Sequence, residues 1–430
     1  AKAFWSLTLY DLAEGFFIPN DRKKYSVGEN GGMKLEEDGG IEIHIAAEKP
    51  EGVPEENWLP IERKDLDLSS TFRLYVPNLE KLKTWTPPKA EKVTAPQAGT
   101  APETKQRDED SAVALDAKQI ENLVRRSYQY VAMYNVNNKC ADDQVKGWNK
   151  TLGKTELLDH TVQVIARPNN DTLYIASMLD RRTEPVILDM PAFDSKYISL
   201  LVSGYDHYVT IPLASRLGDF QKPTKILFYT ARTEGYNSEA VEGIDKVFEG
   251  TCDFLQATVR VMPHAGDPER FQRIVEQVKS FKLLTLSEHR GEKAKPTDEV
   301  AFPAVGETDA DIFENNLLEV MQFVFNHTTF DEGDELDRAL LKAYEPLGVA
   351  PGRTFDANQV AKIDGKRFRA VAERVFQEEM ARSTDPAFAE RHALTKFLPK
   401  GEMELDILVF QSVLGPIGLP AVEAVYVPVE

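Results

Sequence analysis

The chain has 430 residues, which is enough for two or three domains with hydrophobic cores of their own. Its apolar content of 42% and charged content of 28% are typical of a globular protein. A net charge of -19 argues against nucleic acid and anionic membranes as partners, because both attract basic patches, and no apolar run of about 18 residues is present that would span a bilayer.

The first 88 residues are rich in β-branched and aromatic residues and predict three strands, at residues 3–10, 41–45 and 70–76. Apolar and polar residues alternate in the second of these, and Arg73 and Tyr75 share a face of the third. The chain does not begin with a basic segment and a long apolar core, so no signal peptide is predicted. We interpret this segment as a β module.

Residues 89–115 hold prolines among Ala, Thr, Lys, Glu and Asp, with almost no large apolar side chain. Such a segment cannot bury enough surface to offset the entropy lost on ordering. We expect a flexible linker or a tail here.

Residues 116–285 begin with helical spacing over 116–138 and continue as a second β-rich segment. It contains a predicted short helix at 239–249 and a predicted helix from the N-cap Asp267 to about residue 282. Five strands are predicted, at 172–179, 185–190, 196–211, 224–230 and 257–262.

Residues 286–400 are predicted to be helical. Thr308 with Asp311 forms a capping-box pattern for a helix through residue 325, residues 334–344 predict a second helix, and Asp356 with Gln359 is expected to cap a third that runs toward 382. Residues 401–430 return to strand character, at 402–410 and 422–427.

The turn before the strand at 172–179 holds the first candidate site. Asn and Asp favour turns, so a plain turn is the simpler interpretation of this stretch. Polar groups at the mouth of a rigid strand can also line a site. On that hypothesis Asp171 and Tyr174 are catalytic and Asn170 binds the ligand.

A second group of candidates lies in the strand predicted at 196–211. His207 could act as a general base near neutral pH, with Tyr205 on the same face, although a histidine bonded to a neighbour is the simpler interpretation. Arg216 could bind an anionic ligand or form an ion pair. Trp5 and Trp58 are further ligand-binding candidates, with a core or interface role as the alternative.

Cofactor and metal motifs are not found: the sequence has no HExxH, GxSxG, Walker or Rossmann pattern. Asp171, Asp180 and Asp206 could together bind a hard cation such as calcium, although they are far apart in the chain. Cys140 and Cys252 fit either two free thiols or one disulfide.

Several motifs resemble a bacterial family of unknown function. Asn170-Asp171-Thr172-x-Tyr174, Pro185-Val186-Ile187-Leu188 and Met190-Pro191 resemble a DUF1254 domain, over about residues 120–284. The segments FWSLTLYD at 4–11, NWLP at 57–60 and WTPP at 85–88 resemble a DUF1214 domain, over residues 1–88. In the family the second domain follows the first, whereas here it stands first. We therefore interpret the chain as circularly permuted or renumbered, and expect Ala1 and Glu430 to be neighbours.

The resemblance implies a mixed α and β, multi-domain fold, with two antiparallel jelly-roll-like β modules and a helical region. It places residues 401–430 with the first module. It also implies a periplasmic or secreted protein, and so favours a disulfide between Cys140 and Cys252.

Two functions are compatible with these features. One is an exported enzyme, hydrolase-like, or a binder, acting on a small organic ligand in a pocket of the β modules. The other is a structural or assembly protein that forms a homo-oligomer through its jelly-roll surfaces, which would need an extended apolar patch.

Overall fold

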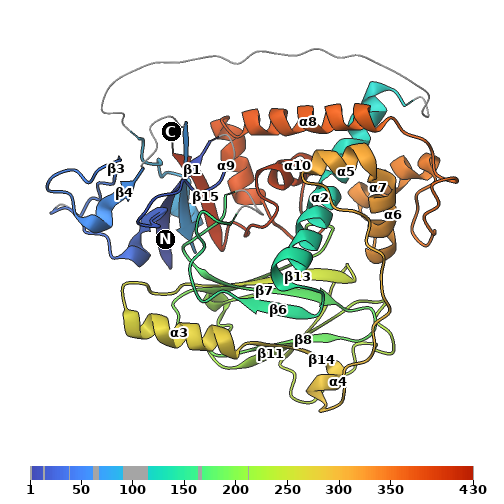
Figure 1. The fold of residues 1–430 in the computed structure, drawn as a ribbon, viewed down its shortest axis with the longest axis horizontal. Coiled ribbons are helices and arrows are strands. Elements are labelled where there is room, and N and C mark those ends of the chain that lie inside the picture. Colours follow the sequence, from blue (N-terminus) through green and yellow to red (C-terminus); the bar gives the residue numbers. More distant parts are fainter. Residues whose placement is uncertain are drawn as a thin grey trace.

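The structure is a computed structural model, and it describes residues 2–12, 15–37, 39–61, 67–90, 115–162, 167–211 and 213–429. Figure 1 shows a small β region at one end, two stacked sheets beside it, and a layer of helices on top of the sheets. The fold is therefore mixed α and β with several antiparallel sheets, as expected. The jelly-roll topology and the domain boundaries stay predictions. The linker expected at 89–115 lies mostly outside the described residues.

The small β region joins the two ends of the chain in one antiparallel sheet. Its strand order is β15-β5-β1-β2, formed by Ala424–Val429, Leu68–Tyr75, Phe4–Asp11 and Ser26–Gly28. Tyr75 pairs with Phe4 on one side and with Ala424 on the other, so the first and last strands flank β5. Ala1 and Glu430, which were expected to be neighbours, lie outside the described residues.

Two short elements extend this region. The parallel strands β3 (His44–Ala46) and β4 (Trp58–Pro60) form a separate pair, and the helix α1 (Leu79–Leu82) follows β5. The strand expected at 41–45 is therefore shorter and shifted, and Ile41 is exposed rather than buried.

The two stacked sheets form the centre of the molecule (Figure 1). The upper one has the order β10-β9-β13-β7-β6, from Leu213–Ala214, Ile198–Ser203, Phe254–Val261, Leu173–Asp180 and Lys150–Gly153. The lower one has the order β12-β11-β8-β14, from Lys246–Glu249, Thr224–Tyr229, Val186–Met190 and Lys282–Thr285. The helix α3 (Pro268–Ser280), capped by Asp267, lies beside them.

The strand β13 is buried along its whole length, because the lower sheet covers one of its faces and the helical layer covers the other. Leu255, Ala257 and Val259 belong to the hydrophobic core. The alternate residues Gln256, Thr258 and Arg260 are polar and also buried. A buried polar face on a central strand is unusual and indicates a special environment above the sheet.

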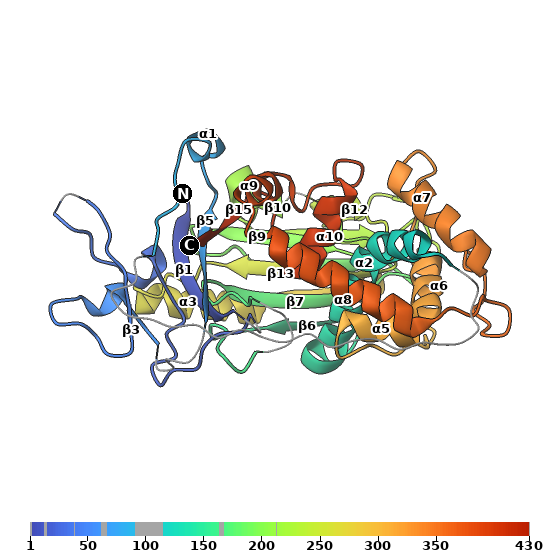
Figure 2. The ribbon, with the colours of Figure 1, turned by 90° about the horizontal axis from the view of Figure 1, so that it is seen from above.

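Helices cover the upper sheet. The longest, α2 (Ala117–Lys139), begins at the capping-box residue Asp116 and crosses this layer beside α8 (Figure 2). The other helices of this layer are α5 (Asp309–Asn315), α6 (Leu317–His327), α7 (Glu335–Tyr344), α8 (Gly365–Arg382), α9 (Pro386–Thr395) and α10 (Leu405–Leu414). The short helix α4 (Leu286–His289) instead follows β14 and contacts the lower sheet.

Four local predictions are wrong. Residues 239–249 form a loop and strand β12 instead of a helix, and residues 402–410 fall largely in helix α10 instead of a strand. Helix α8 begins at Gly365 after the cap Asp364, and not near Asp356. The strand predicted over 196–211 ends at Ser203, because the chain turns there.

Candidate functional site

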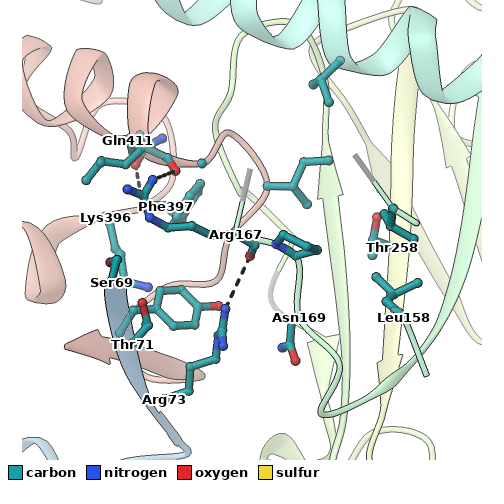
Figure 3. Close-up of a pocket in the computed structure, with 18 of the residues that line it drawn as sticks. Ser69, Thr71, Arg73, Leu158, Arg167, Asn169, Thr258, Lys396, Phe397 and Gln411 are labelled. Atoms are coloured by element: carbon teal, nitrogen blue, oxygen red, sulfur yellow. Dashed lines mark hydrogen bonds between the residues drawn. The ribbon is translucent and has the colours of Figure 1, made fainter. Parts of the chain in front are cut away.

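A cavity of about 740 Å³ lies where the β region, the upper sheet and the helices α8 to α10 meet. Figure 3 shows side chains from all three parts around it, with Arg73 and Thr71 on β5, Thr258 on β13, and Lys396 and Gln411 from the helical layer. Because the three parts are distant in sequence, the cavity exists only after the whole chain has folded.

The buried polar face of the upper sheet forms one wall. Gln256, Thr258 and Arg260 line the cavity from β13, and Tyr174, which pairs with Arg260, lines it from β7. The Arg260 guanidinium lies 5.5 Å from the centroid of the Tyr174 ring. This cation–π contact partly stabilises the buried charge of Arg260.

The strands β5 and β15 form the opposite wall. Arg73 faces Tyr426 across the pair, and its guanidinium donates to Thr8 Oγ1 at 2.7 Å, to Tyr10 Oη and to the Arg167 carbonyl at 3.4 Å. Burial opposes the charge on Arg73, but Tyr10, Asp171 and Tyr75 nearby hold its pKa above the ordinary value. Arg73 is therefore a fixed cation.

The helical layer contributes a buried lysine. Lys396 is 1% exposed, and its Nζ donates to the carbonyls of Leu419 at 2.7 Å and Ala424 at 3.0 Å and lies 3.7 Å from the Tyr426 ring centroid. Burial, together with Arg260 and Arg73, holds the pKa of Lys396 well below its ordinary value. A negative group in the cavity would reverse this effect.

The charges around the cavity are of one sign. Among the described lining residues there is no aspartate or glutamate, whereas the arginines and lysines are Arg73, Lys154, Arg167, Arg260 and Lys396. Arg260 is 3% exposed, and its Nη1 atom has no hydrogen-bond partner among the described residues. Burial lowers the pKa of Arg167. A buried charge without a counter-charge is costly, so the cavity is electrostatically prepared for an anion.

The uncharged lining divides into two kinds. Thr258 Oγ1 and His392 Nε2 are buried polar atoms without a partner in the described part of the chain, and burial and Lys396 lower the pKa of His392 to about 3, so that its ring is neutral. Apolar side chains make up much of the remaining lining, among them Leu158, Met380, Phe410, Leu414 and Ile417. The cavity therefore offers a cationic part and an apolar part.

Comparison with known families identifies the two β-rich segments. Residues 1–79 match the family described as "Protein of unknown function (DUF1214)", and residues 148–283 match "Protein of unknown function (DUF1254)". The chain belongs to this two-domain DUF1254/DUF1214 family. The two domains occur here in the order DUF1214 then DUF1254, as the sequence motifs predicted.

The fold resembles that of a solved structure. The crystal structure of the VPA0106 protein from Vibrio parahaemolyticus aligns with a TM-score of 0.51 and 20% sequence identity, covering 70% of this chain and 68% of that chain. At this identity the likeness concerns the fold alone. No curated protein matches the chain.

Of the site residues predicted in this DUF1254/DUF1214 protein, only Tyr174 lines the cavity. Asp171 lies behind the wall, where its Oδ2 accepts from Ser6 Oγ at 2.5 Å and Tyr75 Oη at 3.1 Å, and its Oδ1 from Ser26 Oγ at 3.2 Å. Because Asp171, just before β7, belongs to the DUF1254 part and these partners belong to the DUF1214 part, Asp171 holds the two together. Asn170 is buried outside the lining, and its neighbour Asn169 faces the cavity instead.

His207 lies in a turn and not in a strand, with a φ of 66°. Its Nε2 is 2.6 Å from the Pro416 carbonyl, and its Nδ1 is 3.2 Å from Gln411 Nε2 and 3.1 Å from Ser412 Oγ. Burial lowers its pKa to about 4, so the ring is neutral at neutral pH. Both ring nitrogens are thus occupied, which fits the simpler interpretation of a bonded histidine.

The other predicted residues have separate surroundings. Tyr205 is in the core, where its Oη accepts a hydrogen bond from Asn138 Nδ2 at 3.4 Å. Arg216 forms an ion pair with Glu423. Trp5 stacks on Phe72, with ring centroids 5.1 Å apart. Trp58 Nε1 donates to the Ala46 carbonyl at 2.9 Å under the guanidinium of Arg22. None of these four lines the cavity.

The structure also bears on the predicted calcium site and on the pairing of the two cysteines. The described residues bring no three His, Cys, Asp or Glu side chains together as a metal site, and Asp180 and Asp206 bond to Arg182 and Thr251 respectively. Of the two alternatives for the cysteines, the structure has free thiols and not the disulfide that the resemblance favoured: Cys140 and Cys252 are free and buried, and burial raises their pKa to about 11 and about 12. No helix in the described ranges is long and apolar enough to cross a membrane.

Sequence reasoning missed Arg260, Arg167 and Lys396. The signal for Arg260 was present, because Gln256, Thr258 and Arg260 alternate with apolar residues in a strand that is otherwise typical of a core. No comparable local signal marks Lys396, whose burial depends on strand β15 and the segment before it.

Proposed function

We propose that this protein binds a small organic anion that also has an apolar part, in the cavity between its two β parts and the helical layer. One observation carries the proposal: the described charged lining residues are all cations, and two of them, Arg260 and Lys396, are almost fully buried without a carboxylate partner. A carboxylate or similar group would provide the missing counter-charge and accept the free Arg260 Nη1–H.

Binding is favoured over hydrolysis because the predicted general base, His207, lies outside the cavity with both ring nitrogens engaged. Of the predicted catalytic residues only Tyr174 could touch the ligand, and next to Arg260 its hydroxyl would orient an anion. Bound calcium, self-association and a location outside the cytoplasm stay predictions that this proposal does not require.

Titration calorimetry with octanoate and octanol tests the charge requirement, because the two probes differ mainly in charge. Octanoate is expected to bind at least about tenfold more tightly, since a hydrogen bond to a charged group contributes about 1.5–3 kcal/mol. Arg260→Met should remove most of this preference and leave octanol binding unchanged. Arg290→Met, on the exposed end of α4, serves as the control. Equal affinity for the two probes in the wild-type protein would refute the proposal.

A further inference from the structure

A second cavity, of about 360 Å³, adjoins the first. It lies between helix α1 with the segment that follows it, helix α9, and strand β15. Its lining is mainly apolar and includes Leu79, Leu82, Trp85, Leu394, Val425 and Val427. Three charged residues also line it, and all three are exposed: Lys83, which is paired with Glu80 at 3.0 Å, Lys89 and Glu390. The second cavity therefore suits a hydrocarbon group and lacks the cationic cluster of the first.

The two cavities share one boundary, since Ser383, Thr384, Ala389 and Tyr426 line both. The hydroxyl of Ser383 donates to the Met380 carbonyl at 2.6 Å, and that of Thr384 to the Ala381 carbonyl at 2.8 Å. Both hydroxyls are thus used by the end of helix α8. Together with the methyl group of Ala389, these two residues give a mainly apolar boundary to any ligand that extends from one cavity into the other.

The cationic cluster lies directly at this boundary. Tyr426 lines both cavities, and Lys396 Nζ lies 3.7 Å and the Arg73 guanidinium carbon 5.8 Å from the centroid of its ring. Arg260 is close enough to both Lys396 and Tyr426 to act on the pKa of each. A negatively charged head group bound by these cations would therefore lie next to the apolar second cavity.

We infer that the two cavities form one site for a single-chain carboxylate. Its carboxylate lies among Arg73, Arg260 and Lys396, and its hydrocarbon chain passes Ala389 into the second cavity. This inference rests on the proposed function and adds the ligand class and the direction of the chain. Ala389 is the smallest side chain at the boundary, so the size of the residue at this position then determines whether a long chain can pass.

Calorimetry with saturated carboxylates of 8, 12 and 16 carbons, below their micelle concentrations, tests the inference. In the wild-type protein the affinity should rise by up to about fourfold for each added CH₂ that is buried. In Ala389→Trp the indole would block the boundary, so the rise should stop near the shorter chains. Hexadecanoate should then bind at least about 100-fold more weakly than to the wild type, because more than three CH₂ groups lose their burial.

Ala387→Trp is the matched control, because Ala387 lies on the exposed side of the same helix and should leave the length dependence unchanged. If the Ala389→Trp protein does not fold, Ala389→Leu gives a smaller shift in the same direction. Binding of all three carboxylates with the same length dependence in the wild type and the Ala389 variants would overturn the inference but leave the proposed function intact. A wild-type protein that binds none of them would refute both.

Discussion

Two regions of this molecule treat positive charge in opposite ways. Between helices α2 and α8, Arg125 bonds to Glu121 and Glu379 at 3.0 Å each and also to Glu378, and Glu379 is in turn bonded to Arg382. In the cavity, Arg260 has no carboxylate in the described lining and keeps one nitrogen unpartnered. The Arg125 network holds two helices together, whereas the unpaired Arg260 lowers the stability of the ligand-free protein. A binding site that is completed only by its ligand is expected to lower stability in this way.

The largest expected effect is on the paired region. Glu379→Gln removes a buried negative charge between Arg125 and Arg382 and should lower the free energy of unfolding by about 3–4 kcal/mol, because the buried amide turns N–H donors toward two guanidinium groups that can only donate. Urea unfolding measures it. Glu373→Gln, which breaks only the exposed pair with Arg369, should cost less than about 1 kcal/mol. Equal losses in the two variants would show that the α2–α8 network is not important for stability.

Acid should lower the stability of the folded protein through protonation of His207, which lies beside helix α10 near the cavity. Its pKa is lowered to about 4 in the folded protein, from about 6.5 in the unfolded chain. The unfolded chain therefore takes up a proton first, and stability is lost as the pH falls from about 6.5 to 4, by about 3 kcal/mol in total. Urea unfolding of the wild type and His207→Gln at pH 7, 5.5 and 4.5 measures this loss. His392 is present in both proteins, so its contribution cancels, and a constant difference between them would contradict the prediction.

Arg260→Met should change the free energy of unfolding in the direction opposite to that expected for Glu379→Gln. Methionine fills a similar volume without a charge, so the ligand-free variant should be more stable than the wild type, by about 1–2 kcal/mol. The comparison uses urea unfolding at pH 7, and the same variant should lose the preference for octanoate. If it is instead destabilised as strongly as Glu379→Gln, Arg260 has a structural role and the contrast between the two regions fails.

The paired region could be anticipated from the sequence more easily than the cavity. Helix α2 was predicted from the helical spacing over 116–138, because such spacing is a local signal. The run at 402–410 was assigned to a strand because a short apolar segment does not distinguish strand from helix; contacts with α2 and α8 decide it. The turn after Ser203 depends on Gly204, where a side chain would collide with Cys252. Residues distant in the sequence settle these cases.

The cavity could not be derived in the same way, because its three most buried cations, Arg73, Arg260 and Lys396, come from β5, β13 and the end of α9. Arg73 was noticed only as a neighbour of Tyr75 on a strand face, and Asp171 and Tyr174 drew attention to the correct turn without revealing their different roles. A local motif marks where the two β parts touch. The sign of the charge in the space between them appears only when all three walls are in place.

The smallest expected change in stability, and the most direct test of the cavity's charge, concerns Lys396→Met. The variant loses an unfavourable buried charge but also two hydrogen bonds, to Leu419 and Ala424, so at pH 7 it should lie within about 1 kcal/mol of the wild type. The pKa of Lys396 is lowered in the folded protein, so above that pKa and below about 10.5 the unfolded chain holds the extra proton. The wild type should therefore gain stability relative to Lys396→Met as the pH rises from 7 to 9.5, as measured by urea unfolding. A difference that does not change with pH would mean that Lys396 keeps its full charge without a ligand, and that Leu419, Ala424 and Tyr426 alone suffice to stabilise it.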